Sequence, residues 1–264
     1  MRKSCLACTA AIPEPFHWKE LLSGSLFRPR PYPPLEEWIC ADCREKLELI
    51  TGEGCALCSR PLANLDGKYI HPVQGKKVCH DCLYWQEWAK ELGLSQVLTG
   101  NRSAIIYNDL AKRLIYRYKF QGDERLKYFF ASLLINLPLD KHFLKEVDLV
   151  VGIPLTDIRL KERGFNQAAQ LARLFAEHYG LAYAEDVLIR LPDDGRTQSK
   201  KSRKERLTDL LQKFIKNPQP LVDINNKNIL LIDDVYTTGA TLHAAAYTLL
   251  KAGVHKVRSL TVAR

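Results

Sequence analysis

Long hydrophobic runs are missing from this sequence. Its longest apolar stretches, residues 148–155 and 229–232, have the length of strands and fall short of the roughly 18 apolar residues that a membrane-spanning helix needs. The start resembles a secretory signal only as far as Lys3, because the segment that follows is weakly apolar and stops at Pro13. Repeats and low-complexity segments are also missing. We therefore expect no transmembrane segment, no export signal and a cytoplasmic protein.

Cysteine is absent after residue 82, although the chain of 264 residues has eight cysteines. The part that contains the cysteines also has no net charge. Residues 1–100 hold 12 basic and 12 acidic residues, whereas residues 101–264 hold 27 and 18 and so carry the whole net charge of +9. Such asymmetry suggests separate tasks, and a basic part suggests an anionic partner. The sequence therefore predicts a cysteine-rich domain over residues 1–95 and a basic domain over residues 96–264.

The eight cysteines form four C-x-x-C pairs, a spacing that turns two thiolates toward one metal ion. The pairs are Cys5 with Cys8, Cys40 with Cys43, Cys55 with Cys58, and Cys79 with Cys82. Two such pairs complete a tetrahedral four-sulfur site, and the 20 residues between the last two pairs match the spacing of a zinc ribbon. The pattern predicts two zinc ions per chain in structural sites.

Other uses of these cysteines stay open on the sequence alone. A disulfide framework needs an oxidising compartment, for which we see no export signal. A redox C-x-x-C pair would occur once beside a thioredoxin-like pattern rather than four times. His71 or His80 could replace a ligand, although eight cysteines suffice for two sites. Sequential pairing is simpler than a cross-braced arrangement, and the proline-rich gap of 31 residues after Cys8 is expected to form an inserted loop.

Strand and helix patterns alternate after residue 100, which favours a parallel α/β sheet. Apolar runs predict strands at residues 104–107, 147–153, 187–191, 228–233 and 257–263. Helical periodicity predicts helices at residues 85–92, 109–120, 122–137, 168–179, 203–211 and 240–250. Ligands of such sheets bind beyond the carboxyl ends of the strands. The loops after Ile153 and Ile232 are therefore the expected site.

One predicted strand ends in two carboxylates, Asp233 and Asp234, and a loop rich in threonine and glycine follows. Backbone N–H groups in such a loop and at the start of the next helix bind phosphate, and threonine hydroxyls add donors. The carboxylates can accept hydrogen bonds from vicinal sugar hydroxyls or help to hold a divalent cation. Ordinary helix capping would explain any one of these residues, but not the whole segment 229–241. The segment therefore predicts a site for a sugar phosphate such as ribose 5-phosphate.

The same segment resembles the phosphoribosyl pyrophosphate (PRPP) motif of type I phosphoribosyltransferases. The resemblance implies that fold, with magnesium and PRPP as ligands, and it implies that Asp233 and Asp234 bind the ribose hydroxyls. The implied 5-phosphate loop consists of Val235, Tyr236, Thr237, Thr238, Gly239, Ala240 and Thr241. The strand end made of Gly152, Ile153, Pro154 and Leu155 resembles the loop of that family whose backbone amides meet the leaving pyrophosphate.

Further segments resemble the ComF family of late-competence proteins over nearly the whole chain. They are YND at 107–109, KFQGD at 119–123, RGFNQ at 163–167, QSK at 198–200 and RKER at 203–206, and the four C-x-x-C pairs match the larger members of the family. The resemblance implies a role in the uptake of single-stranded transforming DNA. It also implies a helicase-like ATPase of the uptake machinery as partner, and a cytoplasmic location that partners bring to the inner face of the membrane.

Two basic clusters offer contacts to anions. Residues 196–206 hold six basic residues, which suit a loop that closes over PRPP, a patch that binds nucleic-acid phosphates, or a solvated loop. Together with a residue near the predicted pyrophosphate loop, the candidates are Arg163, Lys200, Lys201, Arg203, Lys204 and Arg206.

The second cluster interleaves basic and aromatic residues on the predicted helix 109–120, as single-strand binding surfaces do. Its candidate DNA contacts are Lys112, Arg113, Tyr116, Arg117 and Lys119, with Phe120 as a second stacking ring, whereas Tyr118 is expected in the core. No recognition-helix motif occurs, which argues against sequence-specific binding of duplex DNA.

Three functions are compatible with these features. The chain is a DNA-uptake factor that keeps a PRPP site for binding or regulation, an active phosphoribosyltransferase with an unidentified acceptor, or an inert adaptor of the uptake ATPase. Phosphoribosyltransferases usually recognise the acceptor base with a hood segment, and only a strand follows the last predicted helix here. A hood would have to come from residues 83–107 or from the cysteine-rich part.

Overall fold

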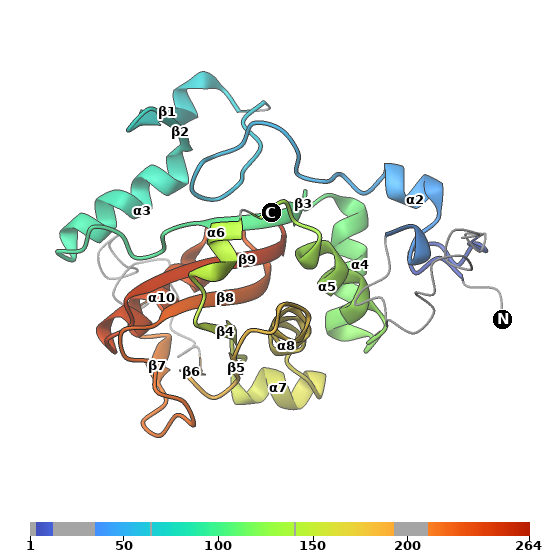
Figure 1. Ribbon diagram of the computed structural model, residues 1–264. Coiled ribbons are helices and arrows are strands. Elements are labelled where there is room, and N and C mark those ends of the chain that lie inside the picture. The colour runs from blue at the N-terminus through green and yellow to red at the C-terminus, as the bar shows by residue number, and fades with distance from the viewer. Residues whose placement is uncertain (1–3, 13–34, 64, 140, 193–210) are drawn as a thin grey trace.

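A computed structural model describes residues 4–12, 35–63, 65–139, 141–192 and 211–264 of the chain (Figure 1). Its centre is a five-stranded parallel sheet in the order β3-β9-β8-β4-β5. The strands are β3 (Asn101–Ile105), β9 (Lys256–Ala263), β8 (Asn228–Val235), β4 (Leu149–Gly152) and β5 (Tyr183–Ala184). The predicted parallel α/β architecture is confirmed.

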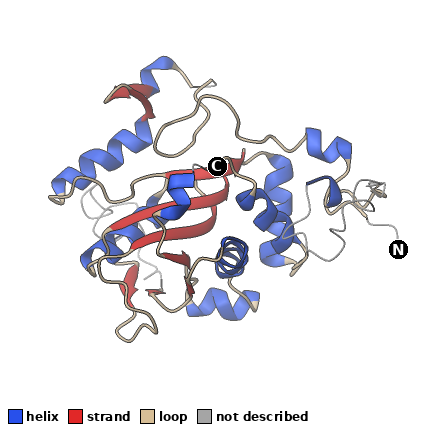
Figure 2. Cartoon of the chain, viewed as in Figure 1, coloured by secondary structure: helices blue, strands red, loops and turns tan. Residues whose placement is uncertain are grey.

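Helices cover both faces of this sheet (Figure 2). They are α3 (His80–Glu91), α4 (Asp109–Phe120), α5 (Leu126–Ile135), α6 (Lys141–Lys145), α7 (Asp157–Arg163), α8 (Gln167–Tyr179) and α10 (Ala240–Lys251). Alternate residues of β8 point to the two faces. Leu230 and Ile232 share a core with α4, α5 and α8, whereas Ile229 and Leu231 share a core with α3 and α10.

The helix signals in the sequence act locally. Helix α4 begins after Asn108, whose side chain accepts a hydrogen bond from the N–H of Ala111 at 3.0 Å. Its apolar residues are buried at a spacing of three to four, with Tyr118 fully buried as expected. Helix α8 is capped in the same way by Asn166 and ends at Gly180, which has the left-handed conformation that favours glycine.

Several strands differ from the expectation. Strand β3 covers Asn101–Ile105 rather than residues 104–107, and the short strand β5 was not predicted. Strand β8 runs on to Val235 rather than ending at Asp233, because its neighbour β9 is long enough to pair with it as far as Ala263. Strand β6 (Leu188–Arg190) does not join the central sheet and instead pairs antiparallel with β7 (Phe214–Lys216). The predicted helix at residues 203–211 lies almost wholly outside the described residues.

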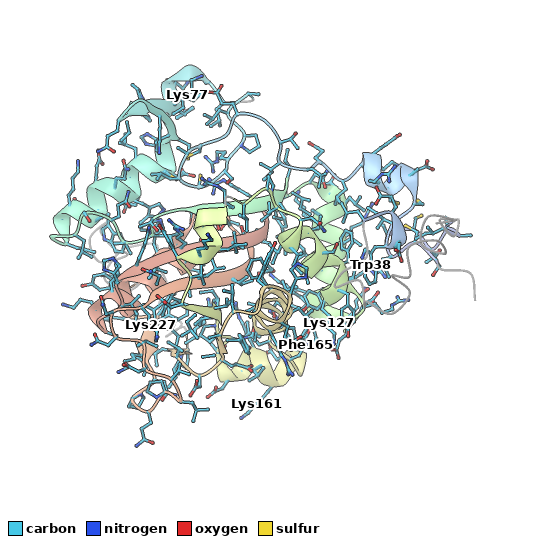
Figure 3. The ribbon with its side chains drawn as sticks, viewed as in Figure 1. Trp38, Lys77, Lys127, Lys161, Phe165 and Lys227 are labelled. Carbon is cyan, nitrogen blue, oxygen red and sulfur yellow. The ribbon has the colours of Figure 1, made fainter. Side chains whose placement is uncertain are left out.

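The cysteine-containing segments pack onto the two opposite faces of the sheet. The first, with η2 (Leu35–Glu37) and α2 (Ala41–Glu45), lies against α4 and α5. Trp38, labelled in Figure 3, belongs to this segment and stacks on Tyr128 of α5 at a ring distance of 6.3 Å. The second contains η3 (Gly67–Tyr69), β1 (Ile70–Val73), β2 (Lys76–Cys79) and α3, and it lies against α10 (Figure 1). The division at residue 95 stays a prediction. In the described part of the chain, every helix is too short or too polar to cross a bilayer.

Candidate functional site

The two loops that the sequence singles out begin at neighbouring strand ends. Strands β4 and β8 are parallel and adjacent, and Gly152 is paired with Ile232 in their register. The N–H of Ile153 donates to the carbonyl of Ile232 at 3.0 Å, and the side-chain amide of Asn166 donates to the carbonyl of Ile153 at 3.1 Å. These bonds hold the start of the predicted pyrophosphate loop beside the two carboxylates.

Gly152 is required where β4 meets α8. A Cβ atom there would lie 2.6 Å from the backbone of Ala169, which is closer than packed atoms allow. The next loop residues, Pro154 and Leu155, are half-buried, and Thr156 caps α7 by accepting from the N–H of Arg159. The close packing of α8 thus brings the loop of residues 152–155 to the edge of the sheet.

Asp233 and Asp234 point to opposite faces of β8. Asp234 is 6% exposed and forms an ion pair with Lys119 of α4. Asp233 is half-buried, and its side chain accepts the N–H of Asp234 at 2.9 Å. Burial, followed by the charge of Asp234, raises the pKa of Asp233 well above its usual value. A cation or a hydroxyl donor beside Asp233 would stabilise its ionised form.

Only part of the segment predicted to hold the 5-phosphate is exposed. Thr237 and Thr238 are exposed, and α10 starts immediately after Gly239, so its first N–H groups have no partner within the helix. Tyr236 differs from the expectation, because its side chain is buried and its N–H already donates to the carbonyl of Ala263 at 2.9 Å. Val235 is the last residue of β8. We therefore use the name phosphate loop for residues 237–241.

The eight cysteines gather into two groups of four, and their pairing is sequential, the simpler of the two arrangements that the sequence left open. The first cysteine site consists of Cys5, Cys8, Cys40 and Cys43, and the second cysteine site consists of Cys55, Cys58, Cys79 and Cys82. In each group the sulfur atoms all lie within 4.8 Å of one another. The Sγ atoms of Cys8 and Cys40, and those of Cys58 and Cys79, are 3.6 Å apart. A tetrahedral zinc ion with bonds of about 2.3 Å separates its sulfurs by about 3.8 Å, so each group can hold such an ion.

The other uses of the cysteines find no support in the described residues. All eight cysteines are free thiols, so they do not form a disulfide framework. His71 and His80 lie outside both groups, and their ring nitrogens face each other at 3.2 Å in an exposed position.

The second cysteine site has a buried cation beside it. The side chain of Arg264 is 3% exposed, and none of its three nitrogens has a hydrogen-bond partner among the described residues. The nearest carboxylate, on Asp81, is 3.9 Å away. Hydrogen bonds with Cys55 and Cys79 raise the pKa of Cys58, and Arg264 opposes this rise. A buried guanidinium needs a counter-charge, and four thiolates around a divalent ion carry the required negative charge.

The predicted DNA-binding helix lines a groove of about 590 Å³. Tyr116 and Phe120 are 55% and 59% exposed, and their rings lie 5.1 Å apart. The guanidinium of Arg163, at the end of α7, lies 4.9 Å from the ring of Phe120. Burial lowers the pKa of Arg163 and the charge of Asp234 opposes this, so the groove reaches the carboxylate edge of the sheet. Lys112 and Arg113 line the same groove and are exposed.

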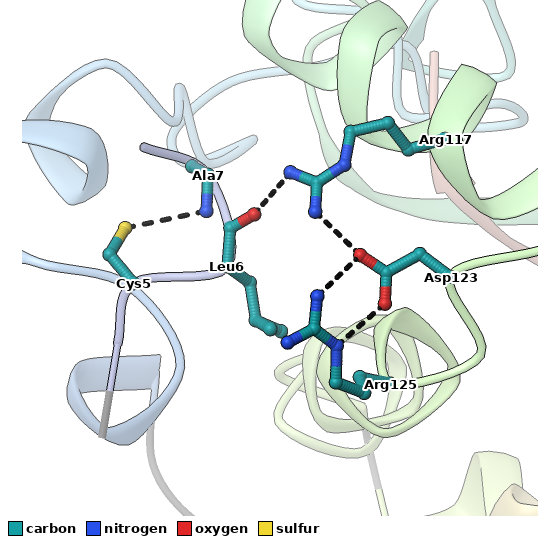
Figure 4. Close-up of polar contacts among 6 residues, drawn as sticks. All are labelled: Cys5, Leu6, Ala7, Arg117, Asp123 and Arg125. Atoms are coloured by element: carbon teal, nitrogen blue, oxygen red, sulfur yellow. Dashed lines mark hydrogen bonds and ion pairs between the residues drawn. The ribbon is translucent and has the colours of Figure 1, made fainter. Parts of the chain in front are cut away.

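Two of the candidate DNA contacts have partly or fully buried partners, whereas Lys112 has only an exposed ion pair with Asp109 at 3.2 Å. Arg117 donates to the carbonyl of Leu6 and forms an ion pair with Asp123 at 2.5 Å, so it joins the first cysteine site to α4 (Figure 4). Lys119 pairs with Asp234. Both side chains therefore hold the protein's own segments together, and a contact of either one with a DNA phosphate stays a prediction. The candidates Lys200, Lys201, Arg203, Lys204 and Arg206 lie outside the described residues.

The residues that lie beneath the phosphate loop are not among the site residues predicted from the sequence. Trp85 of α3 donates its indole N–H to the carbonyl of Thr238 at 2.8 Å. The side chain of Arg264 lies with its guanidinium 4.4 Å from the ring of Tyr236. Only the spacing of Trp85 one turn after Cys82 could have drawn attention to it, and Arg264 carries no local signal.

Comparison with known proteins agrees with this geometry. A family model described as the phosphoribosyl transferase domain matches residues 141–264. Competence protein ComFC of Bacillus subtilis is 37% identical over 98% of this chain and 94% of its own. Competence protein ComFC of Streptococcus pneumoniae is 37% identical over 86% and 87%. Competence protein F of Haemophilus influenzae is 28% identical over 85% and 96%.

The match to the Bacillus subtilis protein extends across the cysteine-containing segments as well as the sheet, because it spans 98% of this chain. The domain match covers both the loop after β4 and the loop after β8. Identity of this level over almost the full length of two chains indicates common descent. The protein is a member of the ComF family of competence proteins and has a phosphoribosyltransferase domain.

Proposed function

We propose that this protein binds PRPP with magnesium at the carboxyl ends of β4 and β8 and binds single-stranded DNA on the exposed face of α4 during DNA uptake. The observation that carries the PRPP part is the register of Gly152 with Ile232, which brings two loops of complementary chemistry together. The names of the relatives support the DNA part.

Each part of PRPP has a matching set of groups. The N–H groups at the start of α10 and the hydroxyls of Thr237 and Thr238 suit the 5-phosphate. Asp233 suits the ribose hydroxyls or the magnesium ion, and the loop of residues 152–155 suits the pyrophosphate. Asp234 enters this set only while it also holds Lys119, so we expect it to orient the site rather than to bind the sugar alone.

Titration with PRPP and magnesium in a calorimeter tests the first part. Asp233→Asn keeps the oxygen that accepts the N–H of Asp234 and removes the charge. A buried hydroxyl or cation then loses its acceptor, and we expect the Kd to rise roughly 10- to 100-fold. Asp223→Asn, an exposed carboxylate on the surface, is the control. Equal affinity of wild type and Asp233→Asn would contradict this placement of the ribose.

The DNA part rests on the groove of α4. Bases can stack on the exposed rings of Tyr116 and Phe120, while Lys112, Arg113 and Arg163 meet phosphates. Double replacement of Tyr116 and Phe120 by alanine should weaken the binding of a fluorescent single-stranded oligonucleotide at least about tenfold, because each stacked base contributes about 1–3 kcal/mol. Unchanged anisotropy curves would move the DNA contact to another surface.

A transferase reaction is the second candidate function, and the domain match favours it. Release of pyrophosphate from PRPP in the presence of candidate nucleobases would establish it. An inert adaptor of a helicase-like uptake ATPase is the third, and failure of both PRPP and DNA to bind would favour it. In all three cases we propose zinc as the ion in both cysteine sites.

A further inference from the structure

One helix connects the second cysteine site to the phosphate loop. Helix α3 begins directly after Cys79 and contains Cys82, and Trp85 follows on the next turn. The indole N–H of Trp85 donates to the carbonyl of Thr238 at 2.8 Å. The same ring stacks on His243 in the first turns of α10, at a ring distance of 4.2 Å. A single side chain therefore contacts both the loop and the helix that follows it.

The stack of Trp85 on His243 is an uncharged contact. Burial lowers the pKa of His243 to about 3, so the imidazole is neutral at physiological pH. The backbone N–H of His243 donates to the carbonyl of Gly239 at 2.9 Å, which is the first hydrogen bond of α10. Displacement of the indole would therefore disturb the start of α10 as well as the loop.

The phosphate loop also rests on a buried ring. Gly239 has a φ of +84°, and a Cβ atom added there would overlap the hydroxyl and ring of Tyr236. The buried Tyr236 ring in turn contacts the guanidinium of Arg264 at 4.4 Å. This places Tyr236 between the loop and the buried cation.

The buried position of the Arg264 guanidinium depends on negative charge nearby. The guanidinium is buried without a hydrogen-bond partner among the described residues, its ion pair with Asp81 is long at 3.9 Å, and it interacts electrostatically with Cys58, so the negative charge of a metal-loaded second cysteine site would compensate it further. The first cysteine site differs, because it lies in the core on the other face of the sheet, with α4 and α5.

We propose that the metal-loaded second cysteine site holds the phosphate loop in its binding conformation, through Trp85 on one path and through Arg264 and Tyr236 on the other. Trp85 and Arg264 are thus positioning residues for phosphate binding. The link to PRPP rests on the proposed function, whereas the link to the loop does not.

The sharpest test compares two tryptophans of α3. Trp85→Phe keeps an aromatic ring over His243 and removes the donor to Thr238. Trp88→Phe is the matched control, since Trp88 is equally buried beside His243 and its indole nitrogen has no hydrogen-bond partner in the described part of the chain. Hydrogen exchange of the His243 amide is measured without ligand, and the affinity for PRPP is then measured by calorimetry.

We expect Trp85→Phe to accelerate exchange of the His243 amide and to raise the Kd for PRPP, each about tenfold, as the loss of one hydrogen bond predicts. Trp88→Phe should change neither beyond about twofold. Equal exchange in the two variants would overturn the inference. If wild type itself fails to bind PRPP, the proposed function is wrong, and the exchange rates still decide the inference.

The metal path has its own test. Cys82→Ser and Cys43→Ser each remove one ligand, from the second and the first cysteine site. The chain has four tryptophans, and ¹⁵N labelling of their indoles gives a signal for Trp85 that Trp85→Phe identifies. We expect Cys82→Ser to move this signal and Cys43→Ser to leave it in place. Equal behaviour of the two variants would contradict the inference.

A third variant covers the case in which Cys82→Ser does not fold. Arg264→Met keeps an unbranched apolar side chain in place of the aliphatic part of arginine and removes the charge. We expect it to raise the Kd for PRPP about tenfold and to alter the rate at which a colorimetric chelator extracts zinc from the protein. If the Kd for PRPP and the rate of zinc extraction both equal those of wild type, Arg264 is not a positioning residue.

Discussion

The two cysteine sites share their ligands and differ in almost everything around them. All four cysteines of the second site are buried, whereas Cys8 of the first site is exposed and Cys40 is half-buried. The first site is joined to α4, which lines the candidate DNA groove. The second is joined to the loop that precedes α10. The same motif thus fastens a helix in one place and supports a binding loop in the other, and its spacing does not distinguish the two roles.

Their charged neighbours differ in the same way. At the first site, Arg117 has a carbonyl and a carboxylate as partners, so its charge is compensated without a metal ion (Figure 4). At the second site, Arg264 has no hydrogen bond to the described residues. The metal charge should therefore matter more for the structure around the second site than around the first.

The largest expected effect is on stability when a site loses its metal. Cys82→Ser and Cys43→Ser should each reduce the zinc content from two ions to one, as measured by elemental analysis. Structural zinc sites contribute about 10–16 kcal/mol of apparent binding energy, so we expect Cys82→Ser to lower Tm by at least about 10 °C. The decrease for Cys43→Ser should be smaller, because that site is more exposed. A larger decrease in Tm for Cys43→Ser than for Cys82→Ser would contradict the proposed difference between the two sites.

The next effect concerns the attachment of the first site. Arg117→Ala removes the donor to Leu6 and one partner of Asp123, so the free energy of unfolding at pH 7 should fall by about 1.5–3 kcal/mol. Arg113→Ala, on the exposed side of the same helix, should stay within about 0.5 kcal/mol of wild type. Urea unfolding measures both values.

The pH dependence of this variant follows from Asp123. Hydrogen bonds from Arg125, and then from Arg117, hold the pKa of Asp123 below its usual value. A lowered pKa gives stability that is present above the ordinary value near 3.8 and is lost as the pH falls through the lowered one. The difference between wild type and Arg117→Ala should therefore shrink as the pH falls below about 4. A constant difference would mean that the bond to Leu6 alone matters.

Local signals explain what the sequence could predict. The apolar spacing predicts a helix at residues 109–120, which are the bounds of α4, and the C-x-x-C spacing predicts two four-sulfur sites. The apolar runs predict β4 and β8 as strands of a parallel sheet whose ligands bind at the carboxyl ends, whereas the pairing of these two strands is found only in the structure.

Contacts between distant segments explain the rest. Lys119 and Asp234 are neighbours only because α4 packs on the end of β8, and Tyr236 is buried only because β9 and α3 cover it. The strand run at residues 187–191 is real, but its partner is β7 rather than the sheet. Nothing near Arg264 in the sequence indicates a buried cation.

A smaller effect is expected at the carboxylates between the two cysteine sites. The pKa of Asp233 is raised in the folded protein, so its stabilising contribution is present at low pH and is lost as the pH rises through that raised value. Asp233→Asn should therefore raise Tm at pH 7, by about 2–4 °C for each kcal/mol relieved, and should have no effect near pH 3. Asp234→Asn should lower Tm, because it leaves Lys119 without its partner. Differential scanning calorimetry of both variants measures this contrast.

The smallest effect on stability is expected for variants of the candidate DNA groove, and their DNA affinity tests whether the two cysteine sites have separate roles. Charge reversal of Lys112 and Arg113 to glutamate changes two exposed side chains that face the groove, so Tm should stay within about 2 °C of wild type. Each phosphate contact on a single strand contributes about −0.7 to the slope of log affinity against log salt, so losing two contacts should flatten the slope by about 1.4. Affinity for PRPP should not change, since neither residue contacts the loops after β4 and β8.

Cys43→Ser, which loosens the support of α4, should weaken DNA binding in the same assay, and Trp85→Phe should not. If Trp85→Phe weakens DNA binding as much as Cys43→Ser does, the two cysteine sites serve one shared surface and their division of roles is wrong.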